Sequence, residues 1–307
     1  MTIRKKKNQW AELIEQRYLY LLLLPGVLFL LVFSYAPIYG VQLAFKDFDP
    51  QLGINDSPWV GLRHIEMFLN APGIQQVFWN TILISFLKIV FGFPAPILLA
   101  ILINEVQHSG VKRTIQTISY LPHFISWIVA ATLIQGLLSP SSGVVGWIYN
   151  DLLKMQAPMI LLDPSSFYPM IILSDIWKEV GWGTVIYLAT MTAINGELFE
   201  AAFIDGCNRF QRIWHITVPA LMPTMVLLLI LRFGGIMNAG FDQLFNMVNP
   251  MTREQGDIID TYIYRVGLQN FEISFSTAVG LTKNLIGFVL LIVTNQVSKR
   301  FSEHSLW

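Results

Sequence analysis

The side chains of this sequence that could recognise a charged ligand lie inside long apolar stretches. Six ionisable residues occur there, namely the cations Lys88, Lys178, Arg232 and Lys283 and the acids Asp175 and Glu179. Ionisable groups at membrane depth are costly, and they usually face a bundle interior or a water-filled cavity. We therefore expect these residues to line a polar path that binds a solute. Alternatively, each cation could snorkel to the interface or pair with an acid within the bundle.

Arg232 is the cation that is hardest to explain by snorkelling. It stands about fifteen residues into its apolar segment, which is roughly 22 Å from the nearer end at about 1.5 Å per residue. We expect it to face a cavity or to bridge two subunits. Asp175 lies three residues before Lys178 and four before Glu179, so on a helix these groups could share one face and partly neutralise each other.

Aromatic and amide side chains accompany these charges. Ligand sites combine apolar and aromatic walls with a few placed polar groups, and sugars in particular are held by aromatic faces and planar polar side chains. The candidate lining comprises Trp177, Trp182, Tyr187, Asn238 and Gln243. Four cations against two acids raise the hypothesis that the solute carries carboxylates, while a neutral solute remains open.

Motifs for catalysis are missing from the sequence. The single cysteine, Cys207, excludes an internal disulfide and a multi-cysteine metal cluster. The five histidines form no His-x-x-x-His pair, and no Gly-x-x-x-x-Gly-Lys-Ser/Thr sequence occurs. We expect no metal site, no ATP bound by this chain and no nucleophile-based enzyme activity.

Composition indicates an all-α integral membrane protein. Hydrophobic residues make up 54% of the chain and charged residues 13%, and the mean hydropathy is +0.53, whereas about a quarter of an average soluble protein is charged. A helix needs about 20 apolar residues to cross a bilayer. Six spans are predicted, at Tyr18–Phe45, Phe78–Asn104, Ile115–Leu138, Tyr168–Met191, Thr217–Gly240 and Ser276–Val297.

The distribution of Lys and Arg predicts the orientation. The basic run Arg4–Lys7 precedes an apolar stretch that is too long for a signal peptide. With the N-terminus inside, eleven Lys and Arg residues lie on the cytoplasmic side and five in the outer loops, in agreement with the positive-inside rule. Both termini and the loop around Glu200 are then cytoplasmic.

That loop is a polar stretch between the fourth and fifth apolar segments. It begins Glu200-Ala201-Ala202 and reaches Gly206, and after nine more residues continues to Ile216 and Pro219. Ala202 and Gly206 are four apart, so a short helix would carry small residues on one face and let another protein approach its backbone. Pro219 suits the first turn of the following helix.

The pattern resembles the EAA loop of bacterial ATP-binding-cassette importer permeases, from which it departs mainly in having Val218 in place of Leu. In that family the loop forms a cytoplasmic coupling helix that docks in a cleft of the ATPase subunit. The resemblance assigns this role to Glu200, Ala201, Ala202, Asp205, Gly206, Ile216 and Pro219. An ordinary amphipathic helix on the membrane surface is the alternative.

Other stretches, above all Ser119–Trp127 and Ser174–Gly183, resemble the polysaccharide and multiple-sugar branch of these permeases. The resemblance implies a type I importer fold in a bacterial inner membrane. It also implies as partners a homologous second permease, two ATPases that hold ATP and Mg, an extracellular solute-binding protein, an oligosaccharide and membrane lipid, but no nucleic acid. The substrate path would include Asp175, Trp177, Lys178, Glu179, Trp182, Arg232, Asn238 and Gln243.

The predicted organisation is one six-helix domain over residues 18–297, with the coupling loop at about 193–216. A basic segment, 1–17, precedes it and a cytoplasmic tail, 298–307, follows it. A secondary transporter is the main alternative, but such folds usually show paired halves, and residues 18–138 and 168–297 show no convincing repeat. A membrane enzyme and an importer permease for amino acids, peptides or phosphonates are further alternatives.

Overall fold

A computed structural model of the chain describes residues 16–301, and this part is built of helices. Within it the only β-type pairing is an isolated bridge between Lys46 and Trp59. Most of the predicted N-terminal segment and most of the predicted tail, residues 1–15 and 302–307, lie outside the described residues.

The helices follow one another with short connections. The first half contains α2 (Arg17–Leu30), η1 (Leu31–Tyr35), η2 (Ala36–Phe45), α3 (Gly53–Asp56), α4 (Arg63–Leu69), α5 (Ile74–Leu87), η3 (Lys88–Gly92), α6 (Pro94–Asn104), α7 (Ser109–Tyr120), η4 (Leu121–Phe124), α8 (Trp127–Leu138), α9 (Val144–Gly146) and η5 (Trp147–Leu152). The second half contains α10 (Pro164–Thr192), α11 (Gly196–Ile204), α12 (Arg209–Arg212), η6 (Ile213–Thr217), α13 (Val218–Gly234), α14 (Phe241–Met247), α15 (Arg253–Gly256), α16 (Ile259–Ile263), η7 (Tyr264–Gln269) and α17 (Ile273–Phe301).

Four helical stretches of the described chain are long and apolar enough to cross a membrane. They are Arg17–Phe45, Ile74–Asn104, Arg209–Gly234 and Ile273–Val297. These confirm four of the predicted spans. The third of them begins earlier than predicted, at Arg209, and ends at Gly234, because residues 235–240 leave the helix before α14 begins.

The predicted span Ile115–Leu138 is wrong as a single straight helix. The stretch Ser109–Phe124 and the helix Trp127–Leu138 are bent by 106° at the break between them. Ile125 and Ser126 are extended there, and the Ser126 side chain caps α8 by accepting from the Val129 backbone N–H. Counted together as one broken span, they bring the number of candidate spans in the described residues to five.

The remaining predicted span, Tyr168–Met191, lies within α10, a helix of 29 residues. Its length is sufficient, but it carries Asp175, Lys178 and Glu179 and is therefore less apolar than the others. The count of six spans stays a prediction. Asp163 caps the first turn of α10, and hydrogen bonds from the Ser165 and Ser166 hydroxyls hold the pKa of its carboxyl below the usual range.

Prolines shape three of the spans. A proline inside a helix lacks the N–H for the carbonyl four residues earlier and its ring crowds that carbonyl, and a widened π-helical turn relieves both problems. Three π-helical turns end two residues before a proline, namely η1 before Pro37, η3 before Pro94 and η6 before Pro219. The chain therefore passes these prolines without breaking the span.

The middle of α10 is the most tightly packed point of the bundle. A Cβ atom on Gly181 would lie 1.9 Å from the Ser119 carbonyl oxygen, and one on Gly183 would lie 2.8 Å from Pro96 Cβ. Only glycine lets α10 come this close to α7 and α6. This contact fixes the position of the side chains that follow on α10, including Trp182.

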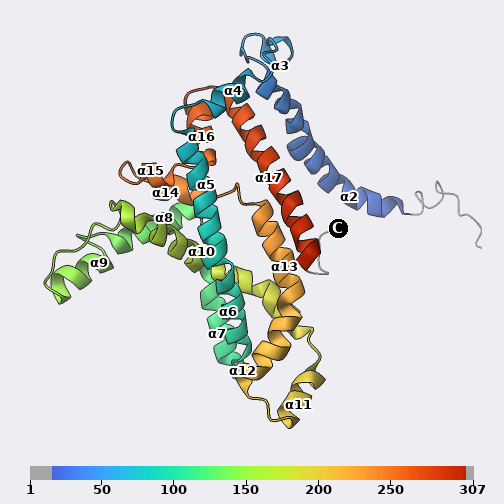
Figure 1. The fold of residues 1–307 in the computed structure, drawn as a ribbon, viewed down its shortest axis with the longest axis vertical. Coiled ribbons are helices and arrows are strands. Elements are labelled where there is room, and N and C mark those ends of the chain that lie inside the picture. Colours follow the sequence, from blue (N-terminus) through green and yellow to red (C-terminus); the bar gives the residue numbers. More distant parts are fainter. Residues whose placement is uncertain (1–15, 302–307) are drawn as a thin grey trace, which may run out of the picture.

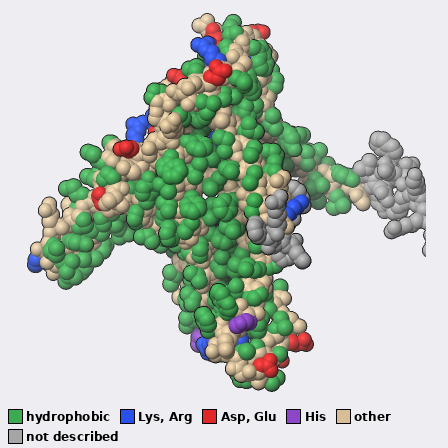
Figure 2. All heavy atoms as spheres, viewed as in Figure 1, with side chains coloured by type: hydrophobic (Ala, Val, Ile, Leu, Met, Phe, Trp, Pro, Cys, Tyr) green, Lys and Arg blue, Asp and Glu red, His purple; other side chains and the backbone are tan. Residues whose placement is uncertain are grey.

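Two parts of the chain stand away from the bundle (Figure 1). The helix α2 has no buried residue and diverges from α17, whereas its continuation η2 packs against α17. The segment with α11 and α12 projects at the end opposite to α3 and α4. Figure 2 shows hydrophobic side chains over the middle of the molecule and charged ones toward its ends, as expected for a membrane protein.

Candidate functional site

The projecting helix α11 is closed at both ends by its own sequence. At its start the Asn195 side chain accepts from the Glu197 N–H at 3.0 Å. At its end the Gly206 N–H bonds to the Phe203 carbonyl at 3.1 Å and the Cys207 N–H to the Ala202 carbonyl at 2.9 Å. This pair of bonds is a Schellman motif, which requires a left-handed residue, and Gly206 has φ +77°.

The next helix starts at once. Asn208 and Gln211 form a reciprocal capping box, in which each side-chain oxygen accepts from the other residue's backbone N–H at 2.8–2.9 Å. From Arg209 the chain runs as one helical stretch through η6 and α13 to Gly234. Ile216 lies half-buried in η6, and Pro219 lies in the first turn of α13, which η6 joins without a break.

Large apolar side chains are exposed on this projecting segment. Five are more than half exposed: Leu198, Phe203, Ile204, Phe210 and Trp214. Of the residues to which the sequence assigned docking, Glu200, Ala201 and Asp205 are exposed and Ala202 is half-buried. The sequence prediction rested on the small residues of the loop and did not include these bulky ones. Their apolar character within a polar loop could have indicated a contact surface, because such side chains have no hydrophobic core nearby.

A second candidate site is a cavity of about 360 Å³ between α6, α10 and α13. The structure brings three predicted residues, Trp182, Tyr187 and Arg232, together in its lining. Phe93 adds further aromatic surface. The side chains of Trp182 and Arg232 are exposed, so both are available to a solute.

The indole of Trp182 is held by a neighbour that sequence reasoning did not single out. The His123 ring stacks on it with the centroids 4.7 Å apart and the planes 1° apart. Nδ1 of His123 donates to the Glu179 carboxylate at 2.7 Å. His123 belongs to η4, next to the bend between α7 and α8, so the bend and the close packing of α10 together position Trp182.

Lys88 and Asp175 pair with each other rather than with a solute or with Lys178. Lys88 Nζ lies 2.9 Å from Asp175 Oδ1, and both side chains are largely enclosed. Nζ of Lys88 also donates to the amide oxygen of Gln243. Gln243 is fully buried, and its Nε2 donates to the Ile171 carbonyl and the Ser174 hydroxyl at 2.7 and 2.8 Å. These groups join η3, α10 and α14.

The other intramembrane lysines are also paired. Lys178 is 5% exposed and lies 3.2 Å from the Glu179 carboxylate, and it donates to the His123 carbonyl at 2.9 Å. Lys283 contacts the carboxylate of Asp260. Among residues 16–301, Arg232 alone of the four membrane-embedded cations has no ion pair.

Two predicted residues lie in other places. Trp177 borders an apolar groove of about 650 Å³ between α8 and α10, away from the Arg232 cavity. Asn238 is exposed and lines a small cavity with Lys283. In the part of the chain that the structure describes, no group of three or more His, Cys, Asp or Glu side chains could hold a metal ion.

Comparison with known proteins places this arrangement in a family. A family model described as the binding-protein-dependent transport system inner membrane component matches residues 92–303. The chain belongs to this family. This permease is also similar over its whole length to Protein LplB of Bacillus subtilis (strain 168), with 41% identity over 100% of this chain and 96% of that protein. It is a carbohydrate ABC transporter permease, a multi-pass and non-catalytic membrane subunit.

Two further relatives have informative names. The polygalacturonan/rhamnogalacturonan transport system permease protein YteP of Bacillus subtilis (strain 168) is 40% identical over 99% of this permease and 94% of its own length. A chain from the crystal structure of a bacterial ABC transporter involved in the import of the acidic polysaccharide alginate superposes with a TM-score of 0.86, with 38% identity over 95% of this permease and 98% of that chain.

Proposed function

We propose that this permease carries oligosaccharides that bear carboxylates, such as uronate oligosaccharides, into the bacterial cytoplasm. The observation that carries the proposal is Arg232, which lies unpaired at membrane depth in a cavity walled by Trp182. A guanidinium binds a carboxylate through parallel, charge-assisted hydrogen bonds, and an indole offers an apolar face to a sugar ring. The relatives that import alginate and polygalacturonan support the same class of substrate.

The excess of four cations over two acids within the predicted spans does not by itself support an acidic substrate. Lys88, Lys178 and Lys283 are neutralised by acids of the same chain. The charge left for a substrate is that of Arg232. In the Arg232 cavity an anionic substrate therefore meets one localised positive charge beside an aromatic wall, which favours a carboxylate bound in a defined orientation.

The projecting segment is proposed to couple this permease to an ATPase. Its exposed apolar side chains, with Phe203 and Ile204 at 73% and 84% exposure, suit burial against a partner surface. The Schellman motif at Gly206 and the capping box at Asn208 hold the segment in shape without help from the bundle. The proposed assembly contains two ATPases, a second permease and a solute-binding protein.

In this assignment α11 and both termini lie in the cytoplasm, and α3 and α4 lie outside. The excess of Lys and Arg on the predicted cytoplasmic side supports this orientation. Purification of the tagged chain from its native host, followed by mass spectrometry, is expected to recover a P-loop ATPase and a second permease. Recovery of the intact chain alone, even after cross-linking through Cys207, would overturn the proposed coupling of this segment to an ATPase.

Uptake of matched oligosaccharides tests the substrate. Cells or vesicles with the complete importer are expected to accumulate trigalacturonate, and an excess of maltotriose should not compete. Equal transport of the neutral and the acidic trisaccharide would overturn the proposed preference. A strain that lacks this permease provides the background rate.

A further inference from the structure

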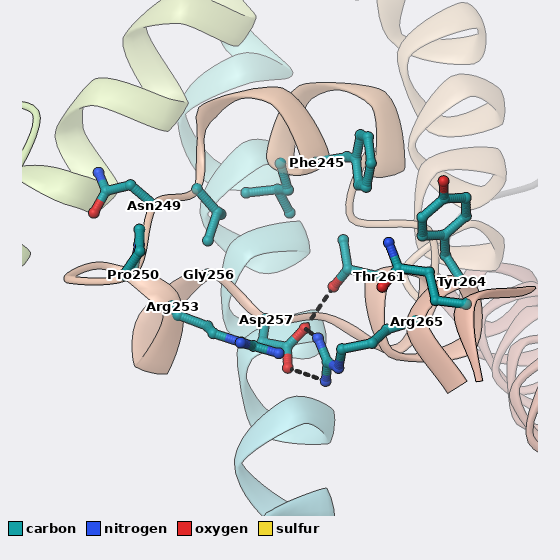
Figure 3. Close-up of a pocket in the computed structure, with 12 residues that line it drawn as sticks. Phe245, Asn249, Pro250, Arg253, Gly256, Asp257, Thr261, Tyr264 and Arg265 are labelled. Atoms are coloured by element: carbon teal, nitrogen blue, oxygen red, sulfur yellow. Dashed lines mark hydrogen bonds and ion pairs between the residues drawn. The ribbon is translucent and has the colours of Figure 1, made fainter. Parts of the chain in front are cut away.

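A further cavity is formed by α14, α15, α16 and η7, which are separate from the elements around the Arg232 cavity. The chain folds back on itself from α14 through α15 and α16 to η7 and encloses a space of about 310 Å³ (Figure 3). That volume is at the low end of the range for small-molecule pockets. The whole cavity lies in the stretch between the last two spans, which the orientation proposed above places on the outer side.

The walls of this cavity are fixed by buried contacts from elsewhere in the bundle. The Asn80 amide of α5 is fully buried and donates to the carbonyls of Glu254 and Asp257 at 2.8 and 3.0 Å. A Cβ atom on Gly256 would lie 2.4 Å from a Val248 methyl group, so any other residue would displace its neighbours. The cavity is thus formed before any ligand arrives, which reduces the entropy lost on binding.

Its charges leave an excess of one cation. Arg265 binds Asp257 in a bidentate pair with distances of 3.1 and 2.7 Å, and the Thr261 hydroxyl donates to the same carboxylate at 2.8 Å. Asp257 is thereby neutralised, as the dashed contacts in Figure 3 show. Arg253 also lines the cavity, is exposed, and has no ion pair within residues 16–301. Its guanidinium is free to bind an anion.

Aromatic rings form the facing wall. Phe245 and Tyr264 meet edge to face with centroids 4.9 Å apart, and both line the cavity. We propose that this cavity, with Arg253 as the carboxylate ligand and Phe245 and Tyr264 as the ring platform, is an outer subsite for a uronate residue of the substrate. The inference rests on the proposed function.

A carboxylated sugar fits this cavity better than an anionic lipid headgroup does. Either would satisfy the Arg253 guanidinium, since phosphate and carboxylate both accept its paired hydrogen bonds. Only the sugar also presents an apolar ring face to the aromatic wall. The subsite would hold the substrate between its release from the binding protein and its arrival at Arg232.

Direct binding to the full chain in nanodiscs of phosphatidylcholine tests the subsite, with trigalacturonate as probe and maltotriose as the neutral comparison. The Arg232→Gln background removes the charge of the inner cavity. In it we expect trigalacturonate binding to persist and to weaken at least about tenfold, or about 1.4 kcal/mol, when Arg253→Gln is added. Maltotriose affinity should not change. Lys154→Gln, which removes an exposed cation outside the cavity, is the matched control and should have no effect.

Each other result has a definite meaning. If Arg232→Gln alone abolishes binding, or if Arg253→Gln weakens both trisaccharides equally, the subsite is overturned and the proposed function stands. If the wild-type chain shows no preference for trigalacturonate, the proposed function fails and the subsite with it. If Arg253→Gln leaves trigalacturonate unaffected but lowers retention of phosphatidylglycerol in mixed-lipid discs, the cavity is a lipid site and the inference is overturned.

Discussion

Lys88 and Asp175 form an ion pair of 2.9 Å that ties η3 to the middle of α10. Gln243 accepts from the same ammonium group and brings α14 into the contact. A membrane interior offers no water to either charge, so each depends on the other. The pair therefore stabilises the bundle and at the same time removes a carboxylate that would repel an acidic substrate.

Breaking this pair should destabilise the protein strongly. Lys88→Met leaves the Asp175 carboxylate buried without a cation, which costs about 3–5 kcal/mol when one partner of a buried pair is lost. Thermal unfolding of the purified chain in detergent measures the loss. Asp175→Asn alone leaves an uncompensated ammonium and should also lower the melting temperature.

The double variant Lys88→Met with Asp175→Asn separates pairing from packing. If the two groups depend on each other, the double variant is destabilised by much less than the sum of the single variants. Additive losses would mean that the ion pair itself contributes little.

Arg232 is expected to decide charge selectivity. Arg232→Gln removes the charge but keeps one amide donor, so the net loss is about that of one charge-assisted hydrogen bond, about 1.5–3 kcal/mol, and the KM for a uronate oligosaccharide should rise about tenfold to a hundredfold. Uptake kinetics at a range of substrate concentrations measure it. Copurification with the partner subunits should be unchanged, and loss of folding would point instead to a structural role.

Gly206 should be essential for coupling because of its backbone conformation. A Cβ atom on Gly206 meets no atom within 4 Å, so Gly206→Leu adds the strain of a left-handed residue, about 1–2 kcal/mol, and a bulky group on the proposed docking surface. We expect the variant to reach the membrane and to lose uptake.

Gly206→Asn is the matched control, since asparagine tolerates the left-handed region and should retain most of the activity. ATP hydrolysis and uptake are measured together in the reconstituted importer. Normal coupling in the leucine variant would remove the docking assignment.

Gly181 and Gly136 offer a comparison of two helix glycines. Gly181→Ala places a methyl group 1.9 Å from the Ser119 carbonyl oxygen, so the yield of folded protein should fall, with a loss of at least about 1–3 kcal/mol. Gly136→Ala meets nothing within 4 Å and should be neutral or stabilise α8 by about 0.5–1 kcal/mol. Equal melting temperatures of the two variants would contradict the packing described for α10.

Much of the fold could be predicted from local sequence properties. Apolar length alone located Arg17–Phe45 and Ile74–Asn104 to within a few residues, because span length is set by bilayer thickness. The bend at Ile125 and Ser126 escaped prediction. The two segments together are apolar enough for a span, and a hydropathy average does not show the direction in which a chain turns.

The site was less accessible to sequence reasoning. Pairs such as Lys88 with Asp175, or Lys283 with Asp260, join residues far apart in the chain, and no periodic pattern encodes them. Helical spacing suggested Lys178 as a neighbour of Asp175, but tertiary contacts gave Asp175 a different partner. The stacking of the His123 ring on Trp182 could not be predicted either, because it depends on the bend between α7 and α8.

The continuous helix from Arg209 to Gly234 has a mechanical consequence. It joins the start of α12, in the projecting segment, to Arg232 without a break, over about 34 Å at about 1.5 Å per residue. Such a rod acts as a lever, and a tilt of about 5° at its docked end displaces the far end by about 3 Å. In the assembly proposed above, a small movement of an ATPase against α12 is transmitted along this helix to the Arg232 guanidinium, so motion of the ATPase and release of the substrate are mechanically linked.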